Sequence, residues 1–373
     1  ALIQQYLGTV RANNGHAPVP DRAEIERLLL SQMDRAPTHL VLVLERREET
    51  QLDYLMNGVV ETGRETNAGR LERWLHLPKL RGIRVANASY PYTVEGARFE
   101  CIEPVRPYHE MRPGPAEREP DRMPGHIWPG SHAFAENFGR LPVGKLSLIE
   151  IDGEVPDYIP GILINPMIAS VVSGGGRVVS VPPSMIPPKE IFESLNKAVP
   201  KHQFLERFRL FDASGQTSQL ETNAKSEFSQ VVIQLKDVIP SAATEAIDSR
   251  PTESPLARFM KEGAALGNPA LVTMFVSGLQ AMAAAMKQPI TEEVLAQFPS
   301  QIQTSFYTTP MHGLVVGPTG APLFERLRRL AGLHLHLSVR LGRIFIYGSN
   351  PWTPAFVMTE GQGNTPYDLL RIV

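Results

Sequence analysis

Short apolar segments alternate with helical segments through most of the second half of the chain, and this alternation is the strongest constraint on its fold. The apolar segments have the length and composition of buried strands, and the segments between them carry helical patterns. Crossover helices join parallel strands into a sheet covered on both faces. The strand patterns are 145–153, 177–181, 205–212, 231–235, 270–276 and 313–316, and the helical patterns are 159–173, 187–199, 255–266, 279–286, 291–303 and 323–330.

The end of the chain follows a different pattern. Residues 333–340 and 343–348 are strand patterns separated only by Leu341 and Gly342, and so short a separation joins antiparallel strands. A further strand is expected at 356–359. The sequence therefore predicts an α/β fold with a doubly wound, mostly parallel sheet and antiparallel strands at its end.

The first part of the chain contains further strand patterns. Residues 38–45 form a continuous apolar run after Pro37, which is typical of a buried parallel strand. Residues 70–77 alternate polar and apolar side chains, and a second extended segment follows at 90–94. This alternation predicts a half-buried strand.

A short basic block follows the strand pattern at 70–77. It consists of Lys79, Leu80, Arg81 and Gly82. Because Lys79 and Arg81 are two residues apart, an extended chain directs both side chains to the same side. Two cations on one face can bind a phosphate, Arg as a planar fork and Lys as a point charge. The alternative is a pair of solvated side chains at a sheet edge.

Three pieces of this region resemble, in their order, the C-terminal part of a RecA-like ATPase domain of the KaiC type. In that family a Y-[MLA]-x-[DN]-[GN]-V-[VI] segment precedes a strand with a K-L-R-G or K-M-R-G block, and a Y-P-F-T-I-like strand closes the domain. Here the pieces are LDYLMNGVV at 52–60, KLRG at 79–82 and YPYTV at 90–94. The resemblance covers about residues 38–103.

The resemblance implies an oligomeric, ring-like ATPase that binds ATP with Mg. In such a protein Lys79 and Arg81 of one subunit reach the γ-phosphate of ATP held by its neighbour, and Leu80 lies between them. Glu45 and Arg46 follow the apolar run at 38–45. Residues at that position in the family border the nucleotide site and a subunit interface.

Parts of the family pattern are missing. The phosphate loop G-x-x-x-x-G-K-[ST] and the acidic Mg ligand precede the matching region in the family, and the sequence contains no match to this loop. Either the sequence starts inside a longer protein that carries both before residue 1, which we expect, or the ATPase half was lost. Ile83 and Val85 also stand where the family has small hydroxyl and histidine residues, so adenine and ribose contacts are not carried over.

The order of elements in the second half resembles a second RecA-like domain, in tandem as in KaiC. Its turn at 152–161, DGEVPDYIPG, has three carboxylates, two prolines and no Lys, Ser or Thr. Carboxylates repel a triphosphate, and proline offers no N–H. Residues 275–277 include no acidic Mg ligand. We expect domains at 1–103 and 131–373, with a Pro-rich linker at 104–130 and a degenerate, non-hydrolysing second domain.

Two further groups of residues are candidates for a site. His334 and His336 lie on one face of a strand pattern and can bind a metal, but no third ligand is indicated nearby, so no metal site is predicted and an interior or interface role is favoured. Arg326, Arg328 and Arg329 form a basic helix face that we expect to be solvated.

Composition excludes several classes of function. The net charge of −2 provides no general attraction for nucleic acid. The single cysteine fits a reducing cytoplasm, and no apolar run is long enough to span a membrane.

Three hypotheses remain. The first is an ATP-binding, homo-oligomeric NTPase with a possible protein client. The alternative is a non-catalytic regulatory or scaffolding protein on degenerate RecA-like domains, and gas-vesicle regulators with a KaiC-like P-loop domain are one resembling group. The third, a DNA-associated recombinase-like protein, is disfavoured by the near-neutral charge.

Overall fold

The computed structural model divides the chain into two units. Unit 1 comprises Ala1–Gly63 and Leu75–Ser89, and unit 2 comprises Arg64–Trp74 and Tyr90–Val373. The residues that the structure describes are 27, 39, 41–45, 53–54, 56–103, 116–156, 158–212, 227–234, 270–285, 292–308, 310–361 and 365–372.

Unit 2 contains a mixed sheet of ten strands in the order β10-β9-β8-β11-β12-β7-β13-β14-β15-β16. Neighbouring strands from β10 to β13 are parallel, and those from β13 to β16 are antiparallel. The predicted α/β fold with antiparallel strands at the end of the chain is confirmed. The strands are β7 (Leu146–Ile151), β8 (Val178–Val181), β9 (Phe208–Asp212), β10 (Val232–Gln234), β11 (Leu271–Phe275), β12 (His312–Pro318), β13 (Ala331–Arg340), β14 (Arg343–Asn350), β15 (Phe356–Glu360) and β16 (Tyr367–Arg371).

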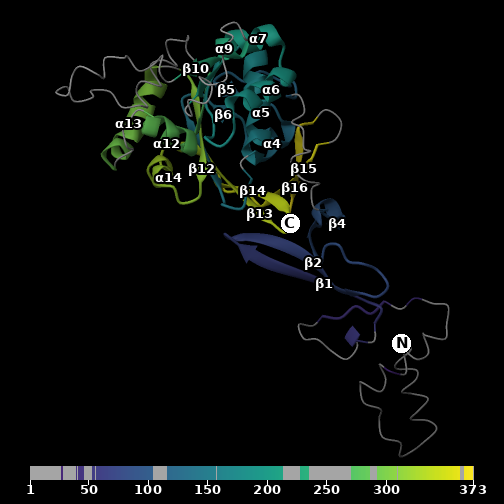
Figure 1. Cartoon of the computed structure of the whole chain (residues 1–373). Helices are drawn as coiled ribbons and strands as arrows, with labels where there is room; N and C mark the ends of the chain where they lie inside the picture. Colours follow the sequence, from purple (N-terminus) through teal and green to yellow (C-terminus); the bar gives the residue numbers. More distant parts are fainter. Residues whose placement is uncertain are drawn as a thin grey trace, which may run out of the picture. The chain divides into compact units, whose positions relative to one another are not determined.

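Helices pack on both faces of this sheet (Figure 1). Side chains alternate between the faces, so Ile149 of β7 packs in the cluster that includes α5, and Leu148 packs in the cluster that includes α12 and α14. Burial on both faces explains why the central strands are apolar throughout. The helices are α4 (His132–Phe138), α5 (Ile159–Ser173), α6 (Pro188–Ala198), α7 (Lys201–Arg207), α9 (Glu227–Val231), α12 (Val276–Ala285), α13 (Glu292–Thr308) and α14 (Pro322–Leu327).

Helix α5 is the most deeply buried of the helices beside the site described below. It is apolar around most of its circumference, as a helix enclosed on several sides must be, and Leu163 and Met167 are fully buried. Burial of each such side chain stabilises the folded state by about 1.5–3 kcal/mol relative to leaving it exposed. Pro160 stands in the first turn, where its missing N–H breaks no helical hydrogen bond. The predicted bounds of 159–173 are confirmed.

The described part of the expected linker belongs to unit 2. Strand β5 (His126–Ile127) pairs with β6 (Leu141–Pro142), and both Ile127 and Trp128 are buried. The indole of Trp128 also donates to the Glu117 carbonyl oxygen at 2.8 Å. The apolar side chains among the prolines therefore pack into this unit, which the proline content alone does not indicate.

The first sheet has the order β1-β2-β3-β4. The strands expected at 70–77 and 90–94 are confirmed, and the first extends to Leu80. Within unit 2, Trp74 packs against Phe345, and Glu72 accepts a hydrogen bond from Arg340 at 2.7 Å. The elements are β1 (Gly58–Asn67), β2 (Arg70–Leu80), β3 (Ser89–Thr93), η1 (Glu95–Ala97) and β4 (Glu100–Cys101).

The buried strand expected at 38–45 is wrong for the residues described there. Residues 41–45 have no regular secondary structure, and Val41 and Val43 are 82% and 89% exposed. A parallel strand requires hydrogen-bonded neighbours, and in the described part of unit 1 no strand pairs with this segment. An apolar run by itself therefore does not produce a buried strand.

Candidate functional site

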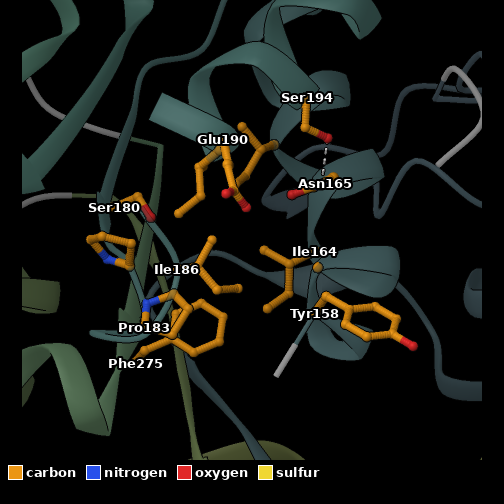
Figure 2. A pocket seen from close by; sticks show the side chains of 13 residues that line it. Tyr158, Ile164, Asn165, Ser180, Pro183, Ile186, Glu190, Ser194 and Phe275 are labelled. Carbon is orange, nitrogen blue, oxygen red and sulfur yellow. Dashed lines mark hydrogen bonds between the residues drawn. The ribbon is translucent and has the colours of Figure 1, made fainter. Parts of the chain in front are cut away.

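A pocket lies at the carboxyl ends of β8 and β11, between the sheet and helices α5 and α6 (Figure 2). These two strands are neighbours, but the chain leaves β8 towards β9 on one side and leaves β11 towards β12 on the other. In open α/β sheets, ligands bind at such a switch point, outside the carboxyl ends of the strands. The cavity has a volume of about 180 Å³.

The pocket has an apolar body with a polar side. Ile164, Ile186 and Phe275 line the apolar part, while the Glu190 carboxylate and the Asn165 amide lie near one another on the opposite side (Figure 2). The Asn165 amide donates to the Ser194 hydroxyl at 3.4 Å. This combination is suited to a small ligand with an apolar body and one polar edge.

Two close contacts shape the sheet side of this pocket. The hydroxyl of Thr273 on β11 donates to the hydroxyl of Ser180 on β8 at 2.7 Å, and both side chains are buried. Helix α12 begins directly against the segment after β8, because a Cβ on Gly278 would lie only 2.0 Å from the carbonyl oxygen of Pro182. Position 278 therefore requires glycine.

The turn between β7 and α5 is where the resemblance to a RecA-like domain predicts the position of a phosphate loop. Described side chains of this turn interact with other parts of the chain. The Asp152 carboxylate accepts from the Thr319 hydroxyl at 2.9 Å, and Val155 is buried. Tyr158 precedes the helix and makes no side-chain capping hydrogen bond. The described turn residues thus offer no Lys, Arg, Ser or Thr side chain to a phosphate.

A second cluster joins β7, β13 and α14. The Glu150 side chain is fully buried, and its Oε1 accepts hydrogen bonds from Arg328 Nη2 and His334 Nε2, both at 2.9 Å. His336 Nδ1 lies 3.7 Å from Glu150 Oε2. The register of the parallel strands brings these side chains together, because His336 pairs with Glu150.

The electrostatics of the cluster favour an anionic Glu150 and a neutral His336. Burial raises the pKa of Glu150, but hydrogen bonds from His334 and Arg328 outweigh it and bring the pKa down to about 2. Burial and the neighbouring His334 lower the pKa of His336 to about 4. At neutral pH the cluster therefore contains a carboxylate and a neutral imidazole.

Within unit 1, the structure brings Lys79 and Arg81 to the same carbonyl oxygen. Lys79 Nζ donates to Asp53 O and Tyr54 O, each at 2.8 Å, and Arg81 Nη2 donates to Tyr54 O at 2.6 Å. Burial, and then the charge of Arg81, lower the pKa of Lys79. Leu80 between them is half-buried.

The other sequence candidates are less informative. Glu45 is exposed in the segment without regular structure, and Arg46 lies outside the described residues. The sequence did not single out Glu150, although the single charged side chain within β7 was a usable signal. Arg328 was expected on a solvated helix face; its side chain is 41% exposed, and it also pairs with the buried Glu150.

The fold defines the chain as an α/β protein with a large mixed sheet and a pocket at a switch point of its parallel strands. The chain is similar to two proteins of Halobacterium salinarum. It is 25% identical to Protein GvpD2 over 215 residues, which are 57% of this chain and 43% of that protein. It is 35% identical to Protein GvpD1 over 105 residues, which are 28% of this chain and 19% of that protein.

The chain thus spans less than half the length of the curated relatives it matches. No family model matches it. Among the described residues, no helix is both long and apolar enough to cross a membrane.

Proposed function

We propose that this chain belongs to a regulatory protein of gas vesicle formation that is built on RecA-like domains. Two observations of different kinds support the proposal. The chain is similar to Protein GvpD1 and Protein GvpD2, and its motifs at 52–60, 79–82 and 90–94 resemble the KaiC type of RecA-like domain. The doubly wound sheet of unit 2 is compatible with a second domain of this kind.

The turn between β7 and α5 carries the regulatory part of the proposal. It stands where a RecA-like ATPase binds phosphate, yet its residues 152–158 include three carboxylates and no Lys, Ser or Thr. In the described part of the turn, Val155 is buried and the Asp152 carboxylate accepts a hydrogen bond from Thr319. Unit 2 therefore acts without hydrolysing ATP, and the pocket at β8 and β11 is its site for a regulatory ligand.

ATP binding and oligomer formation are the finer part of the proposal. Lys79 and Arg81 complete the site for the γ-phosphate of a MgATP bound by a neighbouring subunit, in a ring-like homo-oligomer. Their two positive groups share one acceptor, Tyr54 O, so a phosphate that replaces this carbonyl meets both charges at once. Such cations neutralise the charge that develops in phosphoryl transfer.

The catalytic part is tested with the full-length protein. ATP turnover is measured with MgATP present, and oligomer size is measured with and without MgATP. Arg81→Ala is expected to lower turnover by about 10³-fold, the lower end of the effect of a trans-acting arginine. Arg84→Ala is the control, because Arg84 is an exposed arginine nearby. Equal turnover in the wild type and Arg81→Ala would remove Arg81 from the mechanism.

The regulatory part is tested in a host that forms gas vesicles. Deletion of the gene for the full-length protein is expected to change vesicle abundance, measured by light scattering, and the wild-type gene is expected to restore it. Unchanged vesicle abundance after deletion would refute the regulatory role, whatever the outcome of the ATP experiment.

A further inference from the structure

The buried carboxylate of Glu150 has one oxygen with donors and one without. Oε1 accepts from Arg328 and His334, whereas Oε2 has no hydrogen-bond partner among the described residues. The side chain is 0% exposed. A buried carboxylate oxygen without a donor is costly, and native structures satisfy such atoms. A positive group is therefore expected at Oε2.

The atom that faces Glu150 Oε2 is His336 Nδ1, and this nitrogen can also be a hydrogen-bond acceptor. The Ser349 hydroxyl lies 3.4 Å from the His334 carbonyl oxygen, to which it donates, and 3.0 Å from His336 Nε2. In the tautomer of His336 that carries its proton on Nε2, Ser349 accepts from Nε2–H. A neutral imidazole carries a single N–H, so Nδ1 keeps its lone pair. Two lone pairs thus face each other across 3.7 Å.

We propose that Glu150, His334 and His336 bind a divalent first-row transition metal ion of the zinc type. Glu150 Oε2 and His336 Nδ1 are its facing ligands, and His334 is the third through Nε2, which gives up its hydrogen bond to Glu150 Oε1 as the ring proton moves to Nδ1. One ligand atom from each residue lies within 4.8 Å of the other two. Two ligands about 2.1 Å from a tetrahedral ion lie about 3.4 Å apart, so the 3.7 Å between Oε2 and Nδ1 needs only a small adjustment.

The surroundings of the three residues are also suited to a metal. Tyr347 stacks on the His336 ring with centroids 4.9 Å apart, and Ser349 fixes the orientation of that ring. Arg328 remains on Oε1 and orients the carboxylate without occupying Oε2. Imidazole ligands favour zinc, cobalt and nickel over magnesium and calcium.

The bound ion would connect β7 to β13 and leave a fourth coordination position for water or another ligand. This site lies on the sheet face that α14 covers, and α5 and α6, which line the pocket, cover the other face. Metal binding by these three residues is independent of the proposed function, because it requires neither ATP nor a partner. The competing explanation is that a proton on His336, and no metal, fills the gap.

The experiment uses the full chain, stripped of metal with a chelator and titrated with Co²⁺ as a spectroscopic probe. We expect one Co²⁺ per chain with the intense visible bands of tetrahedral coordination, displaced by Zn²⁺. His336→Ala is expected to weaken Co²⁺ binding by more than about 100-fold, because even outer-sphere partners are worth about 10–100-fold. His202→Ala, which alters an exposed histidine on α7, is the control and is expected to bind as the wild type does.

A thermal unfolding experiment separates binding from a general loss of structure. Zn²⁺ is expected to raise the Tm of the wild type and of His202→Ala, because a ligand that binds only the folded state stabilises it. It is expected to leave the Tm of a folded His336→Ala variant unchanged. The proposal is wrong if the folded wild type binds no Co²⁺, or if His336→Ala binds it equally well.

Discussion

The hydrogen bond between Thr273 and Ser180 gives the sharpest test of the sheet beside the pocket. Thr273 is 0% and Ser180 is 4% exposed, and their hydroxyl oxygens are 2.7 Å apart. Thr273→Val keeps the shape of the side chain but removes the donor. Because it leaves the buried Ser180 hydroxyl without this partner, we expect a loss of about 1–3 kcal/mol in the free energy of unfolding.

A double-mutant cycle isolates this interaction. Ser180→Ala alone is expected to cost a similar amount, since it leaves the Thr273 hydroxyl without its acceptor. The double variant has neither hydroxyl, so its cost is expected to be smaller than the sum by about 1 kcal/mol or more. Thr66→Val, which removes an exposed hydroxyl on β1 within unit 2, is the control and is expected to change stability by less than about 0.5 kcal/mol.

Urea unfolding followed by tryptophan fluorescence measures these values for unit 2. All three tryptophans of the chain, Trp74, Trp128 and Trp352, belong to that unit. Strictly additive effects of the two single substitutions would refute the reasoning, because they would mean that Thr273 and Ser180 do not depend on each other.

Two further predictions concern packing and charge. Gly278→Ala is expected to destabilise unit 2 by about 1–3 kcal/mol, because the added Cβ would overlap the Pro182 carbonyl. Gly153→Ala is the control, because the added Cβ would meet open space, and it is expected to change stability by less than about 0.5 kcal/mol. Equal losses of unfolding free energy in urea for the two variants would contradict this prediction. With chelator present, the lowered pKa of Glu150, about 2, predicts a stabilisation that is complete above about pH 5 and lost as the pH falls towards 2. The lowered pKa of His336, about 4, likewise predicts a loss of stability from about pH 6.5 down to 4. Glu150→Gln and His336→Ala are each expected to reduce the slope in the corresponding range of a series of unfolding experiments, and an unchanged slope would contradict the assignment.

Periodicity in the amino-acid sequence predicts much of the fold of unit 2. The bounds of α5 at 159–173, the central strand β11 and the hairpin of β13 and β14 around Leu341 and Gly342 all follow from local patterns. Local patterns succeed there because the residues that define each element are neighbours in sequence, and the apolar composition of each strand reflects its burial on two faces.

The sequence by itself also determined what the turn after β7 can offer to a phosphate, because its side-chain types are independent of how the chain packs. It predicted that Lys79 and Arg81 point the same way, since this follows from the geometry of an extended chain. Their role towards ATP stays a prediction.

Only the tertiary structure decided which distant residues meet. Glu150 and His334 are 184 positions apart, and the order of β7 and β13 in the sheet makes them neighbours. The burial of Ile127 and Trp128 within a Pro-rich segment, and the exposure of Val41 and Val43 in an apolar one, have the same origin. Burial and charge pairing depend on what the rest of the chain packs against a residue, and that information is not present in any local stretch of sequence.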